Sequence, residues 1–204
     1  MLVTITGTQP FTIDVPGPIN KFNISIPVNY TNSGSIADDG WNMIGNPYPS
    51  TIDWDDPAWT KVRLDNAIYI WDPDLQQYRS YVAGIGNNGG SKFVASSQAF
   101  WVKANAASPS LTIREGVKDN TDMSFVKMAT AQPYRINLTN TLNNYTDQVT
   151  LAFNENASTK FEGSYDAHKV FGPNNAVPSI AAISTDNKEL SIHAFNPKKP
   201  TTFP

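Results

Sequence analysis

The stretch AIYIWDPDLQQYRSYV, residues 67–82, decides the fold class. Residues 67–71 are apolar on both faces, which is typical of a strand in the middle of a sheet. The Asp72-Pro73-Asp74 segment that follows is a turn signal, and residues 77–82 resume a strand-like pattern with two tyrosines and a valine. The stretch therefore predicts an antiparallel β-hairpin.

Alternation of apolar and polar residues extends this pattern along the chain. It occurs at residues 111–113, 134–138, 149–153 and 190–194, and each run is typical of an antiparallel strand with one buried face. Helical periodicity is scarce. The best candidate, residues 157–170, contains Gly163 and lacks a 3.6-residue period, so we expect a loop with one helical turn at most. The chain is predicted to be all-β.

The composition limits the cellular source and the classes of binding partner that fit this chain. The chain has 204 residues, of which 40% are hydrophobic and 16% charged, and its net charge is −3. A mildly acidic chain without a basic run is a poor partner for nucleic acid, and no apolar run is long enough to span a membrane. The absence of cysteine argues mildly for a bacterial or cytosolic source.

Two polar segments suggest how the chain is divided. Residues 83–92, AGIGNNGGSK, predict a long exposed loop, and residues 116–122, GVKDNTD, interrupt the strand pattern. We predict two tandem antiparallel β-sandwich modules, jelly-roll or Ig-like, at residues 1–116 and 123–204, with a linker at 117–122. The second module could lack strands and leave an open sheet edge, so we expect a monomer or an edge-paired dimer.

A longer block carries a family resemblance. GWNMIGNPYPSTIDWD, residues 40–55, resembles the GWNLIGNPYPS-x-IDWD block of large secreted proteins of Bacteroidetes. Residues 68–82 look like the IYIWD hairpin of that family, and SSQAFWVKANAASPSLTI, residues 96–113, is similar to its QAFFVKA…LTF strands. The runs that begin at residues 134, 148 and 189 resemble the region that follows in those proteins, so the likeness extends from about Val3 to Phe195.

The resemblance implies a location and a context. Proteins of this family are secreted by the type IX system and are attached to the cell surface or released, so we expect a secreted or cell-surface location in a bacterium. Their pattern continues with further strands, so we expect this chain to be a fragment with neighbouring domains in a larger polypeptide. The family has no assigned catalytic residues, and none is carried over.

Residues 40–55, which we call the signature block, also allow a structural prediction that does not depend on the resemblance. Trp41, Ile44 and Ile52 look like core residues, and Asn46-Pro47-Tyr48-Pro49 looks like a rigid turn, because proline fixes its own φ and restricts the residue before it. We interpret the block as a corner that defines the fold, with a binding role for Tyr48 as the alternative.

Aromatic residues gather within residues 54–81 and supply the candidate ligand-binding site. Sugar-binding sandwiches use exposed aromatic rings, because the apolar face of a pyranose stacks on them while polar neighbours take the hydroxyl groups. The alternative is that these rings fill the core. The candidate ligand-binding residues are Trp54, Trp59, Trp71, Tyr78, Arg79 and Tyr81.

Aspartates in the same region are candidate calcium ligands, because calcium prefers several carboxylate and carbonyl oxygens from loops. No complete calcium-binding loop motif is present, and the alternative is that these residues form turns and caps. No other cofactor is expected. The candidate metal-binding residues are Asp53, Asp55, Asp56, Asp72 and Asp74.

Catalytic motifs are missing from the sequence. His168 and His193 are the two histidines, nothing in the sequence pairs them, and no nucleophile elbow, HExxH motif or phosphate loop occurs. The leading hypothesis is therefore a non-catalytic module with an adhesive or structural role. A carbohydrate-binding module that targets an attached enzyme to polysaccharide or cell-surface glycan is the second hypothesis, and a polysaccharide-degrading enzyme is the third.

Overall fold

The computed structural model describes residues 17–35, 38–120 and 133–197. Regular structure in these residues is β-strand, apart from one short 3₁₀ helix, η1 (Glu115–Val117), and this confirms the all-β class. The sheets are antiparallel except for one parallel pair of strands, consistent with β-sandwich packing. No helix among the described residues is long and apolar enough to cross a membrane.

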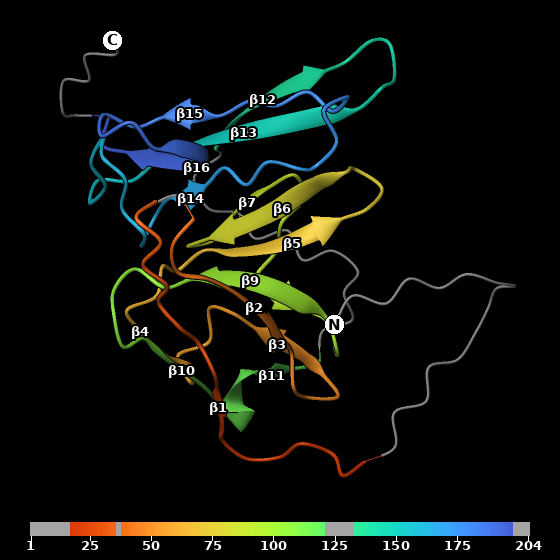
Figure 1. Cartoon of the computed structure of the whole chain (residues 1–204), viewed down its shortest axis with the longest axis vertical. Coiled ribbons are helices and arrows are strands. Elements are labelled where there is room, and N and C mark those ends of the chain that lie inside the picture. Colours follow the sequence, from red (N-terminus) through yellow and green to blue (C-terminus); the bar gives the residue numbers. More distant parts are fainter. Residues whose placement is uncertain (1–16, 36–37, 121–132, 198–204) are drawn as a thin grey trace, which may run out of the picture.

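A central sheet of five strands forms the middle layer of the molecule (Figure 1). In spatial order its strands are β2 (Trp41–Gly45), β9 (Ala99–Lys103), β5 (Ile68–Asp72), β6 (Gln77–Val82) and β7 (Ile85–Asn87). Strands β5 and β6 are the hairpin that the sequence predicted, with Ile68 opposite Tyr81 and Asp72 opposite Gln77. The predicted exposed loop at residues 83–92 is wrong in its first half, because β7 lies there and Asn87 is fully buried.

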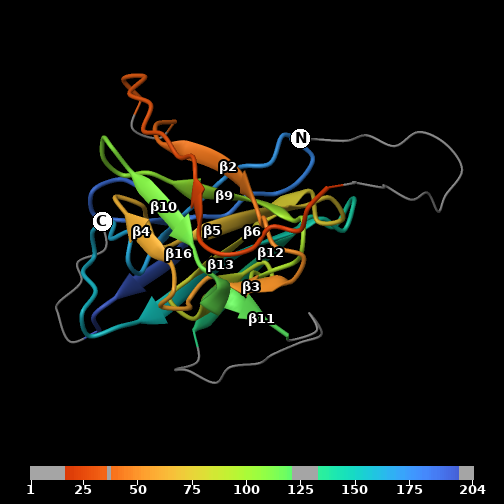
Figure 2. The same ribbon diagram turned by 90° about the horizontal axis from the view of Figure 1, so that it is seen from below.

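Two small sheets cover one face of the central sheet (Figures 1 and 2). One sheet consists of β1 (Ile24–Ile26), β10 (Ser110–Ile113) and β4 (Thr60–Val62). The other consists of β11 (Lys118–Asp119), β3 (Thr51–Asp53) and β8 (Phe93–Val94). The large core between these sheets and the central sheet contains the fully buried Ile52, Trp54, Phe100, Leu111 and Ile113.

The linker predicted at residues 117–122 is corrected in its first part. Val117 is fully buried in this core, and Lys118 pairs with Ile52 in the β11–β3 ladder. Residues 117–119 are therefore part of the first half of the fold, because an apolar side chain and two backbone partners hold them there. Residues 121–122 lie outside the described residues.

A second sheet packs against the other face of the central sheet (Figure 1). Its strands are β12 (Tyr134–Thr139), β13 (Thr146–Phe153), β16 (Glu189–Phe195) and β14 (Ala167–His168), and β15 (Ala182–Ile183) also pairs with β16. Tyr69 and Val82 of the central sheet share a buried cluster with Ala167 and Ile192 of this sheet. The two halves of the chain therefore share a core, and their division into two domains stays a prediction.

Strand β12 departs from the predicted burial. Its existence and its pairing with β13 are confirmed, but all six of its residues are exposed, including Tyr134, Ile136 and Leu138. The alternating pattern was correct in period, yet β12 is an edge strand whose apolar row is left largely uncovered by the described part of the chain.

The turn in the signature block is built around one buried amide. Asn46 donates from Nδ2 to the carbonyl oxygens of Ser50 (2.7 Å) and Ala95 (3.0 Å), and its Oδ1 accepts the backbone N–H of Tyr48 (3.0 Å). Tyr48 is itself buried in the core, and its hydroxyl donates to the carbonyl oxygen of Phe22. These contacts support the interpretation of the block as a corner of the fold.

Candidate ligand-binding pocket

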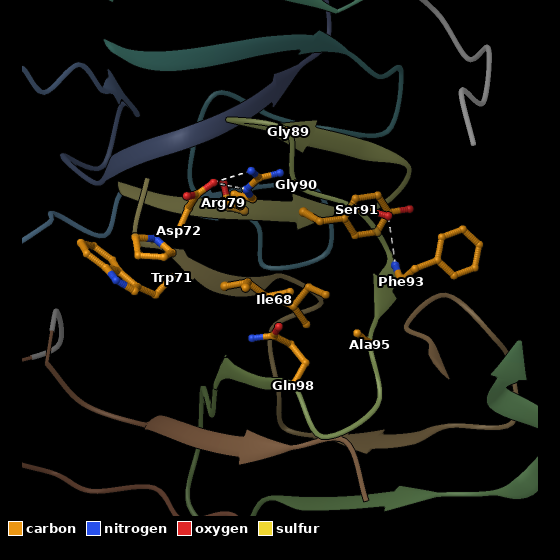
Figure 3. A pocket seen from close by; sticks show the side chains of 14 residues that line it. Ile68, Trp71, Asp72, Arg79, Gly89, Gly90, Ser91, Phe93, Ala95 and Gln98 are labelled. Atoms are coloured by element: carbon orange, nitrogen blue, oxygen red, sulfur yellow. Dashed lines mark hydrogen bonds and ion pairs between the residues drawn. The ribbon is translucent and has the colours of Figure 1, made fainter. Parts of the chain in front are cut away.

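A pocket of about 280 Å³ lies beside the β5–β6 hairpin, and we call it the hairpin pocket. Its volume is close to the lower end of the range for small-molecule sites, about 300–1,000 Å³. The hairpin supplies one wall, and the segments 89–91 and 93–98 supply the others (Figure 3). From the hairpin, its lining includes Ile68, Ile70, Trp71, Asp72, Arg79 and Tyr81.

Strand register brings most of the hairpin residues of the pocket to one face, whereas Trp71, which is paired with Tyr78, points to the other face. Ile68 is paired with Tyr81 and Ile70 with Arg79, and paired residues of antiparallel strands point to the same side of the sheet. Ile68 and Tyr81 are buried in the large core, so the partly exposed Ile70 is the apolar side chain of this face that lies open next to the guanidinium group. The Tyr81 hydroxyl is already engaged, because it donates to the Asp55 carboxylate and accepts the N–H of Gly84 (2.9 Å).

Asp72 fixes the position of Arg79 in the pocket. The Asp72 Oδ2 accepts from Arg79 Nε (2.5 Å) and forms an ion pair with Nη2, while Oδ1 accepts the backbone N–H groups of Asp74 (2.9 Å) and Leu75 (3.1 Å). Burial alone would raise the pKa of Asp72, but the Leu75 N–H and Arg79 outweigh it and lower the pKa. Asp72 is therefore a carboxylate whose acceptor sites are filled, whereas the Arg79 side chain is 45% exposed.

Two glycines allow the neighbouring loop to pass close to this pair. A Cβ on Gly90 would lie 2.0 Å from the carbonyl oxygen of Ser80, so only glycine fits where the loop lies against β6. Gly89 has a φ of +77°, and a Cβ there would lie 3.2 Å from Arg79 Nη1. The loop thus closes the pocket without displacing the guanidinium group.

The structure distributes the predicted ligand-binding residues among three places. Trp71, Arg79 and Tyr81 line the hairpin pocket. Tyr78 faces the second half of the chain, where its ring meets the Trp71 ring edge-on with centroids 5.1 Å apart. Trp54 and Trp59 lie in the large core, with their rings 4.9 Å apart, so they are not at the pocket.

Four of the five predicted calcium ligands contact protein groups through their carboxylates. Asp53 forms an ion pair with Lys92 (2.6 Å), and Asp55 accepts from Tyr81. Asp56 accepts the N–H of Ala58 (2.7 Å) as a turn former, and Asp72 caps the hairpin turn, in which Asp74 is exposed. Among the described residues, no group of three or more His, Cys, Asp or Glu side chains is placed to hold a metal ion. Calcium binding stays a prediction.

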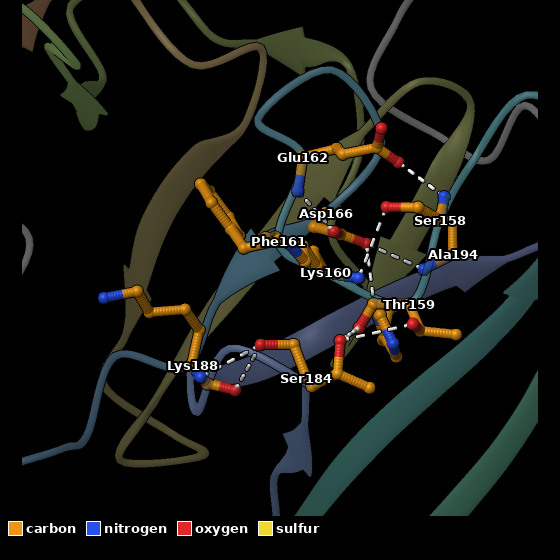
Figure 4. A network of polar contacts seen from close by, with 12 residues as sticks. Ser158, Thr159, Lys160, Phe161, Glu162, Asp166, Ser184, Lys188 and Ala194 are labelled. Carbon is orange, nitrogen blue, oxygen red and sulfur yellow. Dashed lines mark hydrogen bonds and ion pairs between the residues drawn. The ribbon is translucent and has the colours of Figure 1, made fainter. Parts of the chain in front are cut away.

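The two histidines face different carboxylates. His193 Nδ1 lies 3.2 Å from Asp166 Oδ1, and Asp166 also accepts the N–H groups of Ala194 (2.8 Å) and Glu162 (2.7 Å), as Figure 4 shows for the last two contacts. His168 stacks on Phe161 with ring centroids 4.2 Å apart.

The Nε2 atom of His168 lies 4.0 Å from Oδ2 of Asp65, an oxygen that is buried and has no hydrogen-bond donor. Burial raises the pKa of Asp65, against the hydrogen bond from Asn105 and the charge of Lys103. Sequence reasoning missed both buried aspartates, because each is an isolated acidic residue next to a strand and nothing in the sequence distinguishes it from a turn former.

No protein-family model matches this chain, and neither a curated protein nor a solved structure matches it.

Proposed function

We propose that this chain is a non-catalytic module of a larger secreted bacterial surface protein, with an adhesive or structural role. The observation that supports it is the set of buried polar contacts that join the sheets. Ser80 and Ser191 are hydrogen-bonded between the hydroxyl groups (2.8 Å), and the Thr150 hydroxyl donates to Asn87 Oδ1 (2.8 Å). Satisfied polar networks in a low-dielectric interior make a fold rigid and specific.

Further contacts extend this network along the interface. Gln77 Nε2 donates to the carbonyl oxygen of Pro178 (3.0 Å), and the backbone N–H of His168 donates to the Tyr69 hydroxyl (2.8 Å). These donors and acceptors are paired inside the fold and stabilise its shape, although Gln77 Oε1 is buried without a hydrogen-bond partner. A rigid body of stacked sheets suits a spacer or an adhesive unit of a surface protein.

Two measurements test this proposal. We expect the amides of β5, β6, β13 and β16 to exchange hydrogen together, because a rigid module opens as one unit. We also expect no release of reducing or unsaturated sugars when the purified chain is incubated with a panel of polysaccharides. Independent opening of the two halves contradicts the rigid module, and steady product release contradicts the non-catalytic role.

The carbohydrate-binding alternative is favoured by the hairpin pocket. An apolar wall beside an anchored arginine is the combination that suits a sugar ring and its hydroxyl groups. Retention of microspheres coated with the chain on immobilised polysaccharide, against microspheres coated with albumin, tests it; equal retention counts against carbohydrate binding. The enzyme alternative gains no support here, since Asp72 is the single carboxylate in the lining of the hairpin pocket and glycosidases use a pair.

A further inference from the structure

We propose that the hairpin pocket binds an uncharged sugar ring, with Arg79 and Gln98 taking hydroxyl groups at opposite edges of the ring. This inference rests on the carbohydrate-binding alternative and specifies its ligand. Figure 3 shows Arg79 and Gln98 on opposite sides of the pocket, and the partly exposed Ile70, which is paired with Arg79, supplies the apolar contact. A pyranose has the same order of features, because its apolar C–H face lies between hydroxyl groups at its edges.

Arg79 supplies hydrogen-bond donors to the pocket. Its Nε and Nη2 contact Asp72, which leaves the N–H groups of Nη1 and the outer N–H of Nη2 without a partner in this ion pair. Nη1 is the atom that faces Gly89 at the rim. Since the Asp72 contact restrains the guanidinium group, little side-chain entropy is lost when a hydroxyl oxygen accepts from it.

The hydrogen-bond acceptor for a sugar hydroxyl lies on the side of the pocket opposite Arg79 (Figure 3). Gln98 donates its Nε2–H to the carbonyl oxygen of Ala99 (3.0 Å), which orients the amide and leaves Oε1 as an acceptor. Ser91 adds a hydroxyl at the rim, where its Oγ accepts the N–H of Phe93 (3.1 Å) and keeps its proton for donation. The pocket therefore offers donors and an acceptor at separate edges.

Charge selects against acidic sugars. Arg79 and Asp72 are the charged residues of the pocket lining, and they neutralise each other. A carboxylate ligand that approached Arg79 would also approach Asp72, and the repulsion would offset the attraction. A neutral hydroxyl group meets no such penalty. We therefore expect methyl glycosides of neutral hexoses to bind more tightly than the matching uronic acids.

Saturation-transfer NMR and calorimetric titration of the purified full chain test this inference. The probes are the methyl glycosides of glucose, galactose and mannose, with glucuronate and galacturonate as their acidic counterparts. We expect at least one neutral glycoside to bind, and Arg79→Ala to weaken that binding by about tenfold or more, since hydrogen bonds to charged groups contribute about 1.5–3 kcal/mol. Gln98→Ala, at a partly exposed side chain, is expected to weaken it severalfold.

Arg135→Ala is the matched control, because Arg135 is an exposed arginine on the edge strand β12. It should leave binding unchanged. Tighter binding of the uronic acids, no binding of any neutral glycoside, or binding that both pocket variants retain in full would overturn the inference. If microspheres coated with the natural chain and with the pocket variants adhere equally well to polysaccharide, the hairpin pocket is the wrong site and the carbohydrate-binding alternative stands.

Discussion

His168 is a single residue whose charge state is set by its surroundings. Burial, together with the positive charges of Lys103 and Lys188, lowers the pKa of His168 to about 4, and Asp186 opposes this shift. The folded chain thus holds a neutral imidazole where the unfolded chain binds a proton below its ordinary value of 6.5. Because the unfolded state binds more protons between these two values, stability falls as the pH decreases through this window.

Substitution His168→Phe isolates this effect, since a phenyl ring can keep the stack on Phe161 and cannot titrate. We expect the natural protein to lose about 3 kcal/mol of unfolding free energy relative to the variant between pH 7 and pH 4. Urea unfolding at several pH values measures it. All other ionisable groups are common to the two proteins, so parallel stability curves would contradict the assignment.

At the residue scale, the sequence predicted the burial of side chains whose placement follows from their local pattern. It missed side chains whose placement depends on partners far away in the chain. Ile44 and Ile52 are buried as expected, because alternation and hydrophobicity are enough to place them. Trp54 and Trp71 look alike in the sequence, yet one is in the core and the other lines a pocket. Asn87 is buried because it reaches Thr150, 63 residues away in the chain, and no local pattern reports such a partner.

At the scale of the elements, Gly40 determines how β2 begins. It has a φ of +76°, and a Cβ at this position would lie 2.0 Å from the carbonyl oxygen of Ala104. Its own carbonyl oxygen accepts the N–H of Ala104 (2.7 Å), so the contact cannot open without loss of the β2–β9 pairing nearby. Gly40→Ala should therefore destabilise the protein by about 2 kcal/mol or more.

Gly45→Ala, at the other end of β2, is the control for this prediction. A Cβ on Gly45 meets nothing within 4 Å, and its φ is not positive. We expect this variant to stay within about 0.5–1 kcal/mol of the natural stability in the same thermal or urea unfolding experiment. Equal losses for the two variants would show that the close approach at Gly40 is not the cause.

Longer elements could be predicted from the sequence, and short ones could not. The β5–β6 hairpin and the strands β13 and β16 have four or more alternating or apolar residues, which is enough for a period to be recognised. Strands β7 and β11 have three and two residues, in segments whose composition is typical of loops. They are strands because neighbouring strands offer backbone partners, which is a tertiary effect.

At the scale of the whole molecule, the arrangement of the halves was beyond the sequence pattern. Alternation predicts one buried face for each strand, but β16 is buried on both faces, with Leu190 and Ile192 as well as Ser191 and His193 inaccessible. Burial of the polar face arises because other parts of the chain supply hydrogen bonds to it, as Ser80 does for Ser191. The sharing of one core by the two halves therefore depends on side-chain pairs that lie far apart in the sequence.

The buried ion pair between Lys169 and Asp147 tests how strongly this arrangement is held. Both side chains are almost inaccessible, and Asp147 also accepts the N–H of Ile180 (2.8 Å) and an amide proton of Asn88 (3.1 Å) from the first half. Lys169→Met leaves the carboxylate buried without its cation, so we expect the free energy of unfolding in urea to fall by about 3–5 kcal/mol.

Lys160→Met, at an exposed lysine, is the control and should change the free energy of unfolding little. The double variant Lys169→Met/Asp147→Asn should recover part of the loss, because it removes both charges together. Strictly additive losses would show that the two residues are not coupled.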